Sequence, residues 1–124
     1  MTKTLSEVNR MVRAIRAHPD FHKAGMIASH LGVVRSFSRG GRSVSGVDVA
    51  FDDEKLNRIV RDIKSRHGIV DVPIETNSGK LKVRDPIVTV VVAGDIRDNV
   101  FPALIDAVNR LKSEAVAKEE NLAD

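Results

Sequence analysis

The sequence predicts an α+β fold in which helices pack on a mixed sheet, with the elements in the order α-β-β-α-β-β-α. Apolar residues recur at helical intervals in three segments, and the segments between them show strand-like alternation or β-branched runs. No linker, internal repeat or low-complexity stretch interrupts the 124 residues. We therefore expect one domain that covers residues 1–124.

The first half of the chain is expected to form a helix and two strands. Thr4 and Glu7 have the spacing of a helix-starting capping box, and Pro19 ends the helical pattern. The apolar stretch 25–34 and the alternating stretch 43–51 then predict two strands. A basic loop joins these two strands.

The middle of the chain is expected to form a helix, 52–68, and two further strands. Segment 69–75 alternates, and its Pro73 cannot donate a ladder hydrogen bond, which places this strand at a sheet edge. Segment 76–86 is expected to be a loop. The nearly unbroken β-branched run 87–94 predicts a central strand that is covered on both faces.

The last part of the chain is expected to be a helix followed by a tail. Asp95 is expected to cap this helix, whose apolar stripe runs from Val100 to Leu111. The polar segment 117–124 is expected to fray.

The composition narrows the classes of function. The chain has no cysteine, which excludes disulfides and thiolate chemistry. His18 and His22 stand four residues apart, but Pro19 prevents one helix from carrying both, so we expect no metal site. The sequence lacks a run of about 20 apolar residues and a signal-peptide pattern, so we expect a cytoplasmic protein without membrane contact.

The charge and the aromatic content favour a local anion site over a surface that wraps nucleic acid. The net charge is only +3. Proteins that bind single strands stack bases on aromatic side chains, whereas this chain has no Trp or Tyr and only four Phe. We expect Phe51 and Phe101 to lie in the core, and we therefore expect no nucleic acid partner.

Three groups of basic residues are candidates for chemistry. The first is Arg35, Arg39 and Arg42, in a loop whose glycines let backbone N–H groups approach an oxyanion. Guanidinium groups bind phosphate in a forked geometry. The alternative is a solvated loop whose arginines bind no ligand.

The other two groups are expected at the ends of the final helix. Arg97 lies in its first turn, where a cation opposes the helix dipole unless it has a partner, either a ligand or a nearby acid. Lys112 and Lys118 are expected near its end, where a lysine beside other cations can act as an acid, a base or an amine nucleophile. Their alternative role is to complement the helix dipole.

Two longer stretches carry a family pattern. "KAGMIASHLGVVR" is similar to A-G-A-hydrophobic-x-x-F-x-G-x-V-R, and "SGKLKVRDPIVTVVVAGDIR" is similar to I-G-x-L-x-x-G-D-x-x-V-x-V-x-V-x-x-x-H-R. From about Lys23 to Lys118 the chain therefore resembles the large, catalytic subunit of molybdopterin synthase. The residues that agree are Gly25, Gly32, Val34, Arg35, Gly79, Leu81, Asp85, Val88, Val90 and Arg97.

The resemblance implies the fold of that large subunit and a role in making the dithiolene of the molybdenum cofactor. It implies a homodimer in which each protomer binds a ubiquitin-like small subunit with a C-terminal Gly-Gly thiocarboxylate. Sulfur would pass from this tail to cyclic pyranopterin monophosphate, and no cofactor of the chain's own is implied. The implied site residues are Lys112 and Lys118 as catalytic groups, and Arg35, Arg97, Arg39 and Arg42 as substrate-binding groups.

Several positions depart from the family pattern. Ile96 replaces the histidine before the matching arginine, and Arg84 replaces a glycine. The stretch "LKSEAVAKEE" lacks the family's Pro and Trp, and a one-residue gap decides whether Lys118 or Glu119 matches the second family lysine. The family's extended C-terminal segment has no counterpart in the 124 residues.

These departures leave two alternatives to a working synthase subunit. One is a catalytically silent dimeric binding module that retains the anion pocket or the Gly-Gly tail pocket. The other is a basic RNA-binding domain, whose RNA affinity would depend steeply on salt.

Overall fold

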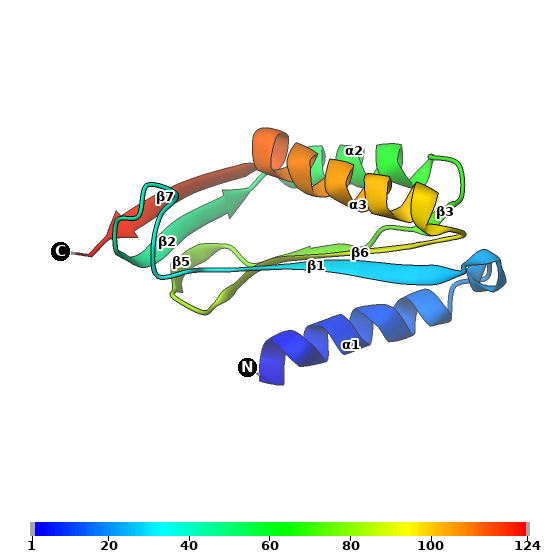
Figure 1. Cartoon of the computed structure of the whole chain (residues 1–124), viewed down its shortest axis with the longest axis horizontal. Coiled ribbons are helices and arrows are strands. Elements are labelled where there is room, and N and C mark those ends of the chain that lie inside the picture. The colour runs from blue at the N-terminus through cyan, green and yellow to red at the C-terminus, as the bar shows by residue number, and fades with distance from the viewer. Residues whose placement is uncertain (1, 124) are drawn as a thin grey trace.

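The structure of the protein, a computed structural model, describes residues 2–123 and the side chains of residues 7–123. Its strands form two antiparallel sheets, and its helices cover both faces of the larger sheet (Figure 1). A 3₁₀ turn, Phe21–Lys23, precedes β1, and a π-helical turn, Leu111–Ala115, precedes β7. The elements are α1 Thr2–Arg16, β1 Met26–Val33, β2 Val44–Phe51, α2 Asp53–Lys64, β3 Ile69–Asp71, β4 Ile74–Thr76, β5 Gly79–Lys82, β6 Pro86–Gly94, α3 Arg97–Arg110 and β7 Val116–Leu122.

Strand β6 is the centre of the larger sheet. It pairs with β1 on one side and with β3 and β4 on the other, which confirms the predicted central position of 87–94. Its alternate side chains point to opposite faces. Val90 packs beneath α2 and α3, Val91 packs against α1, and both side chains are fully buried. A β-branched run therefore forms this strand because both of its faces are in the core.

Segment 69–75 lies at the sheet edge, as predicted. It forms two short strands, β3 and β4, that are separated at Pro73 and pair with successive parts of β6. The Pro73 carbonyl accepts a hydrogen bond from Val91 N at 3.0 Å, so the chain stays against β6 although proline has no N–H to donate.

The smaller sheet contains two strands that we did not predict. It has the order β5-β2-β7 and lies at one end of the molecule, beyond the end of α3 (Figure 1). Strand β5 lies within the predicted loop 76–86, and β7 occupies most of the tail 117–124, so the prediction that this tail frays is wrong. A polar sequence forms β7 because β2 supplies backbone partners along it. The α+β class is confirmed, but the predicted mixed sheet is not found, because the described strand pairings are all antiparallel and form two sheets.

The starts of two helices differ from the predictions. Helix α1 begins at Thr2, so its first turn already includes Thr4, whose side chain is outside those described. At α3 the N-cap is Ile96, one residue after the predicted Asp95. The Asp95 carboxylate accepts hydrogen bonds from Asn99 Nδ2 at 2.9 Å and from Ile96 N at 2.6 Å. These bonds lower the pKa of Asp95, and the bond from Asn99 has the largest effect. Asp95 therefore stabilises the start of α3 from the residue before the N-cap.

The aromatic residues are less buried than expected. Phe51 is half-buried and packs against the cores of both sheets, so it helps to join them. Phe101 is 48% exposed, so its predicted place in the core is wrong. It lies on the solvent side of α3, whereas Val100 beside it points to the sheet. Among the described helices, none is long and apolar enough to cross a membrane.

Arg84 occupies a turn position that favours glycine, which is the residue of the family pattern. Its φ is 84°, and this left-handed conformation costs a non-glycine residue about 1–2 kcal/mol. Arg84→Gly removes that cost, offset in part by the greater freedom of glycine in the unfolded chain. We expect the free energy of unfolding to rise by about 0.5–1 kcal/mol, measured by urea denaturation. Lys80→Gly, in the extended strand β5, is the control and should lower stability; equal losses in both variants contradict the prediction.

Candidate functional site

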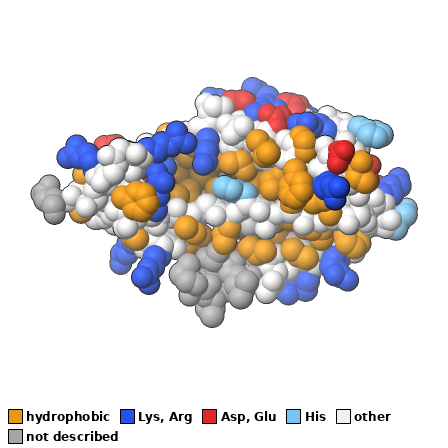
Figure 2. All heavy atoms as spheres, viewed as in Figure 1, with side chains coloured by type: hydrophobic (Ala, Val, Ile, Leu, Met, Phe, Trp, Pro, Cys, Tyr) orange, Lys and Arg blue, Asp and Glu red, His pale blue; other side chains and the backbone are white. Residues whose placement is uncertain are grey.

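A cavity of about 720 Å³ lies where the two sheets meet. Its walls come from the end of β1 with the loop that follows, from the π-helical turn after α3, and from β7, while β2 and β6 contribute apolar side chains. In Figure 2, Lys and Arg side chains gather at the end of the molecule that holds the smaller sheet.

The cavity brings together four of the six residues that the sequence indicated. Arg35, Arg39, Lys112 and Lys118 line it, and Glu120 is the carboxylate residue among its lining side chains. In the part of the chain with described side chains, none of the four cations belongs to an ion pair. The cavity therefore carries an excess of positive charge that suits an anionic ligand.

Arg35 is placed by the buried residue before it. Val34 is 3% exposed, and its backbone bonds to two adjacent residues of the turn before β6: its N donates to Asp85 O at 3.0 Å, and its O accepts from Arg84 N at 2.7 Å. The Arg35 guanidinium lies over the Phe37 ring, 4.9 Å from its centre. This cation–π contact holds the guanidinium without neutralising its charge.

The loop after Arg35 separates the other two arginines. Ser38 and Arg42 close a tight turn, in which Ser38 N donates to Arg42 O at 2.8 Å and Arg42 N donates to Ser38 Oγ at 3.1 Å. Gly41 has a φ of 85°, which a glycine adopts readily. Arg39, at the turn, lines the cavity, whereas Arg42 does not. The predicted substrate-binding role of Arg42 therefore receives no support from its position.

Lys112 is presented by the π-helical turn that ends α3. The buried residues Leu111 and Ala115 hold this turn against the core. The Arg110 guanidinium donates to Asp62 on α2 at 2.9 Å and makes two bonds to Glu114, at 2.9 and 3.2 Å. The turn that carries Lys112 is thus tied to a neighbouring helix, and such π-turns occur frequently at functional sites.

Lys118 lies on strand β7 rather than on the last helix, where we expected it. Val49 of β2 is opposite Lys118, and Asp48 is opposite Glu119. Because neighbouring residues of a strand point to opposite faces, Lys118 shares the inner face of the buried Val49. Lys118 therefore lines the cavity with Lys112, whereas Glu119 points to the other face of the sheet.

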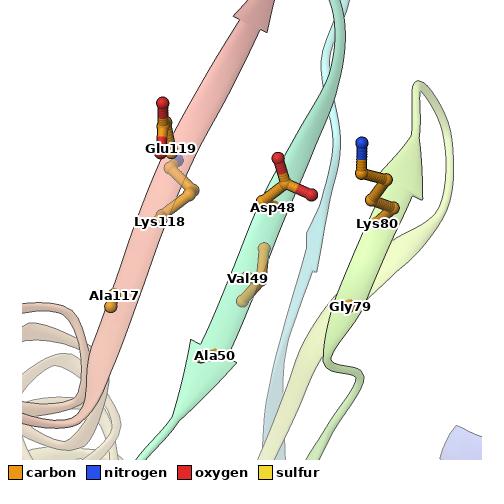
Figure 3. A pocket seen from close by; sticks show the side chains of 8 residues that line it. All are labelled: Asp48, Val49, Ala50, Gly79, Lys80, Ala117, Lys118 and Glu119. Atoms are coloured by element: carbon orange, nitrogen blue, oxygen red, sulfur yellow. The ribbon is translucent and has the colours of Figure 1, made fainter.

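Glu119 belongs to a different surface. A shallow depression of about 490 Å³ lies over the smaller sheet, and Figure 3 shows Asp48 between Glu119 of β7 and Lys80 of β5. The strand register places these three side chains side by side on the outer face. Lys118 lines both this depression and the cavity, but Asp48, Lys80 and Glu119 give the outer surface charges of both signs.

Arg97 is remote from the cavity within one chain. It is the first residue of α3, and Lys112 follows 15 residues later, so the two lie about 20 Å apart along the helix. Arg97 is exposed and forms no ion pair among residues 7–123. Neither of the acids nearest to it in the sequence, Asp95 or Asp98, forms an ion pair with it.

Two titratable residues of the cavity, His30 and Glu120, were not among the predicted site residues. The signal for His30 was the alternation of β1, where Met26 and Ala28 face the α3 side and His30 continues the series. Glu120 could not be placed in the cavity from the sequence, because the tail that contains it was not predicted to be a strand. Among the described residues, no cluster of three or more His, Asp or Glu could hold a metal ion.

The inner position of Lys118 predicts a difference between two adjacent side chains. Lys118→Ala should weaken the binding of inorganic phosphate about tenfold, because a hydrogen bond to a charged group contributes about 1.5 kcal/mol. Glu119→Ala, on the outer face, should change it by less than about twofold. NMR titrations of both variants with inorganic phosphate, at the same pH, measure the two affinities. If Glu119→Ala altered the affinity as much as Lys118→Ala, the assignment of the two faces would be wrong.

Comparisons with solved structures gave several close matches of the fold. Molybdopterin cofactor biosynthesis protein E from Burkholderia multivorans ATCC 17616 is 29% identical, with a TM-score of 0.74, over 94% of this chain and 83% of that chain. The molybdopterin biosynthesis MoaE protein from Burkholderia ambifaria MC40-6 is 25% identical, with a TM-score of 0.73, over 94% and 82%. A complex of subunits 1 and 2 of the molybdopterin-converting factor from Helicobacter pylori 26695 contains a chain that is 14% identical, with a TM-score of 0.69, over 94% and 84%.

The family comparison covers most of the sequence. A search of curated proteins gave no match. The family described as MoaE protein matches residues 1–114. With this match and the two Burkholderia structures, the chain is shown to belong to the MoaE protein family, the large subunits of molybdopterin synthase in molybdenum cofactor biosynthesis.

Proposed function

We propose that this chain is the sulfur-transferring large subunit of a molybdopterin synthase. In this role it takes sulfur from a thiocarboxylated small subunit and passes it to cyclic pyranopterin monophosphate to form the dithiolene. The observation that carries the proposal is the cavity in which Arg35, Arg39, Lys112 and Lys118 meet without ion-pair partners among the described side chains.

The cavity suits the charges of the reactants. A cyclic phosphate and a thiocarboxylate are both anions, and guanidinium and ammonium groups form charge-assisted hydrogen bonds with such anions. Arg35 and Arg39 are placed to bind an anionic group of the substrate. Lys112 and Lys118 project from different elements into the same space, so one of them can exchange a proton or act as an amine while the other stabilises charge.

The partner in this proposal is a ubiquitin-like small subunit with a C-terminal Gly-Gly. The Helicobacter structure is a complex of two subunits of the corresponding factor, and one of its chains has the fold described above. A glycine tail is narrow enough to enter a cavity of this size, and its terminal thiocarboxylate would meet the lysines.

The open edge of β1 supports a homodimer. Within the described residues, β1 pairs only with β6, which leaves the eight-residue outer edge of β1 available for a second strand. Leu31 and Val33 on β1 are exposed, as are Phe101 and Ile105 on α3, and Ile105 is 60% exposed. In the view of Figure 2, hydrophobic side chains gather along these elements. An apolar strip beside an open strand edge is typical of an interface.

A homodimer of this kind would also give Arg97 a role. Arg97 lies near the Met26 end of β1, where Met26 pairs with Gly94, whereas the cavity lies at the opposite end, beside Val33. Antiparallel pairing of two β1 edges about a two-fold axis reverses these ends. Arg97 of the second copy would then approach the cavity of the first.

The silent binding module remains the second candidate because of Ile96. This residue is 54% exposed and apolar at the position where the family has a histidine. A module of this kind would bind the small subunit or phosphate and form no product.

The proposed chemistry is tested by a single-turnover assay with a thiocarboxylated small subunit and cyclic pyranopterin monophosphate. Wild-type protein should form the dithiolene, and Lys112→Ala and Lys118→Ala should each reduce the rate at least about 100-fold, the usual contribution of a proton-transferring group. Lys80→Ala, on the outer face, should keep the wild-type rate. Binding of the small subunit without product in the wild-type protein would select the silent module instead.

The role of Arg97 across a dimer is tested by mixing inactive variants. Arg97→Ala and Lys112→Ala should each be inactive alone, but a mixed dimer has one intact cavity, so a mixture should recover about one quarter of wild-type turnover. A mixture of Lys112→Ala with Lys118→Ala is the control and should recover nothing, because both residues belong to the same chain's cavity. Recovery in neither mixture, or a monomeric protein in sedimentation, would contradict this arrangement.

A further inference from the structure

His30 lies inside the cavity, on a face of β1 that is otherwise apolar. Met26 and Ala28 pack into the core beneath α3, and His30, two residues further on, has the same orientation but reaches the end of the core. Gly32 leaves room for the ring, because a Cβ on Gly32 would lie 3.5 Å from His30 Nε2 and 3.2 Å from Val88 Cγ1. The imidazole is half-buried and borders the cavity.

Among the described side chains, the ring has no hydrogen-bond partner that would account for its position. The hydrogen bonds among the side chains of residues 7–123 include none to His30. The neighbouring strand β6 places the apolar residues Val88 and Val90 beside it. The charged groups that face the cavity from the other elements are Arg35 and Arg39 from the loop, Lys112 from the π-helical turn, and Lys118 and Glu120 from β7.

These surroundings disfavour a charged imidazole while the cavity is empty. Partial burial lowers the pKa of His30, and the positive charge of Lys112 lowers it further. The ring is therefore neutral near pH 7, since even an unperturbed histidine has a pKa of about 6.5. An anion that entered the cavity would offset the positive charges around the ring, and it would offer an acceptor for its N–H.

We propose that His30 is a substrate-binding residue that takes up a proton when a phosphate group enters the cavity and donates a hydrogen bond to it. This inference rests on the proposed function only for the identity of the phosphate as that of the substrate. The protonated ring adds a positive charge to the cavity only while the anion is present. His30 thereby adds an imidazole to the cavity, in a chain that has isoleucine at position 96, where the family pattern has a histidine.

The direction of the pH dependence follows from linkage. Because the anion favours protonated His30, anion binding raises the His30 pKa, and lowering the pH through that raised pKa strengthens anion binding. Sulfate is a suitable probe because it stays a dianion from pH 5 to 8, whereas inorganic phosphate itself titrates in that range.

The test is an NMR titration of the histidine ring protons from pH 5 to 8, with and without sulfate, on the whole protein. His30→Phe assigns the His30 signal among the four histidines, and it is compatible with the fold because the family pattern has Phe at this position. Without sulfate, the His30 midpoint should lie below about 6.5. Saturating sulfate should raise this midpoint by about one pH unit, which corresponds to about tenfold tighter sulfate binding when His30 is protonated.

Three further measurements make the test specific. Lys112→Met should raise the His30 midpoint in the absence of sulfate, whereas Lys80→Met, a lysine on the outer face, should not. In His30→Phe, sulfate affinity should lose its dependence on pH between 5 and 8. Acetate, a monoanion that resembles the tail carboxylate, should raise the midpoint less than sulfate does.

Several results would overturn the inference. One is a His30 midpoint that sulfate leaves unchanged, and another is a larger shift of that midpoint with acetate than with sulfate. A third is the absence of detectable sulfate binding at about 50 mM, a concentration at which electrostatic binding is still seen. The outcome is separable from that of the proposed function. A sulfate-linked shift of the His30 midpoint without dithiolene formation would support this inference and contradict the sulfur-transfer role. Dithiolene formation without the shift would support the sulfur-transfer role and contradict this inference.

Discussion

Burial of β6 on both faces is the constraint on which the rest of the structure depends. A strand of Val and Ala with no exposed face requires cover above and below, and it receives α2 and α3 on one side and α1 on the other. It also requires partners along both edges, and β1 fills one edge while β3 and β4 share the other. The directions of β1 and α3 are thus set by one strand, and both end at the same place, next to the smaller sheet.

The cavity is a consequence of that common end point. Phe51, Ile87 and Val116 pack against the cores of both sheets and join them there, but the chain segments that leave the larger sheet diverge around these residues. One segment becomes the basic loop and another becomes the π-helical turn and β7. The side chains of the candidate site therefore lie on short connections and directly follow buried residues, as Arg35 follows Val34 and Lys112 follows Leu111.

The charges of the molecule are arranged in two different ways. On the helical layer they compensate one another: Arg66 pairs with Asp106 at 3.1 Å, and Arg110 with Asp62 at 2.9 Å. Such exposed pairs contribute little stability individually, but they leave no net local charge. The cavity holds four cations and Glu120, and the cations repel one another until an anion enters. The net positive charge of the cavity depends on which residues line it, and it does not follow from the modest overall charge of +3.

Elements with local signals could be predicted from the amino-acid sequence alone. The central strand was evident because a β-branched run has few other stable environments, and the edge strand was evident from Pro73. Arg35, Arg39, Lys112 and Lys118 were recognised because their residue types and the family resemblance indicated anion chemistry.

Features that depend on distant partners could be established only from the tertiary structure. The polar tail became β7 only because β2 pairs with it, and that register put Lys118 inside and Glu119 outside. Helix length separated Arg97 from the cavity, and the orientation of β1 brought His30 into it. The physical reason is that strand pairing and cavity lining are non-local, so no window of sequence contains the residues that decide them.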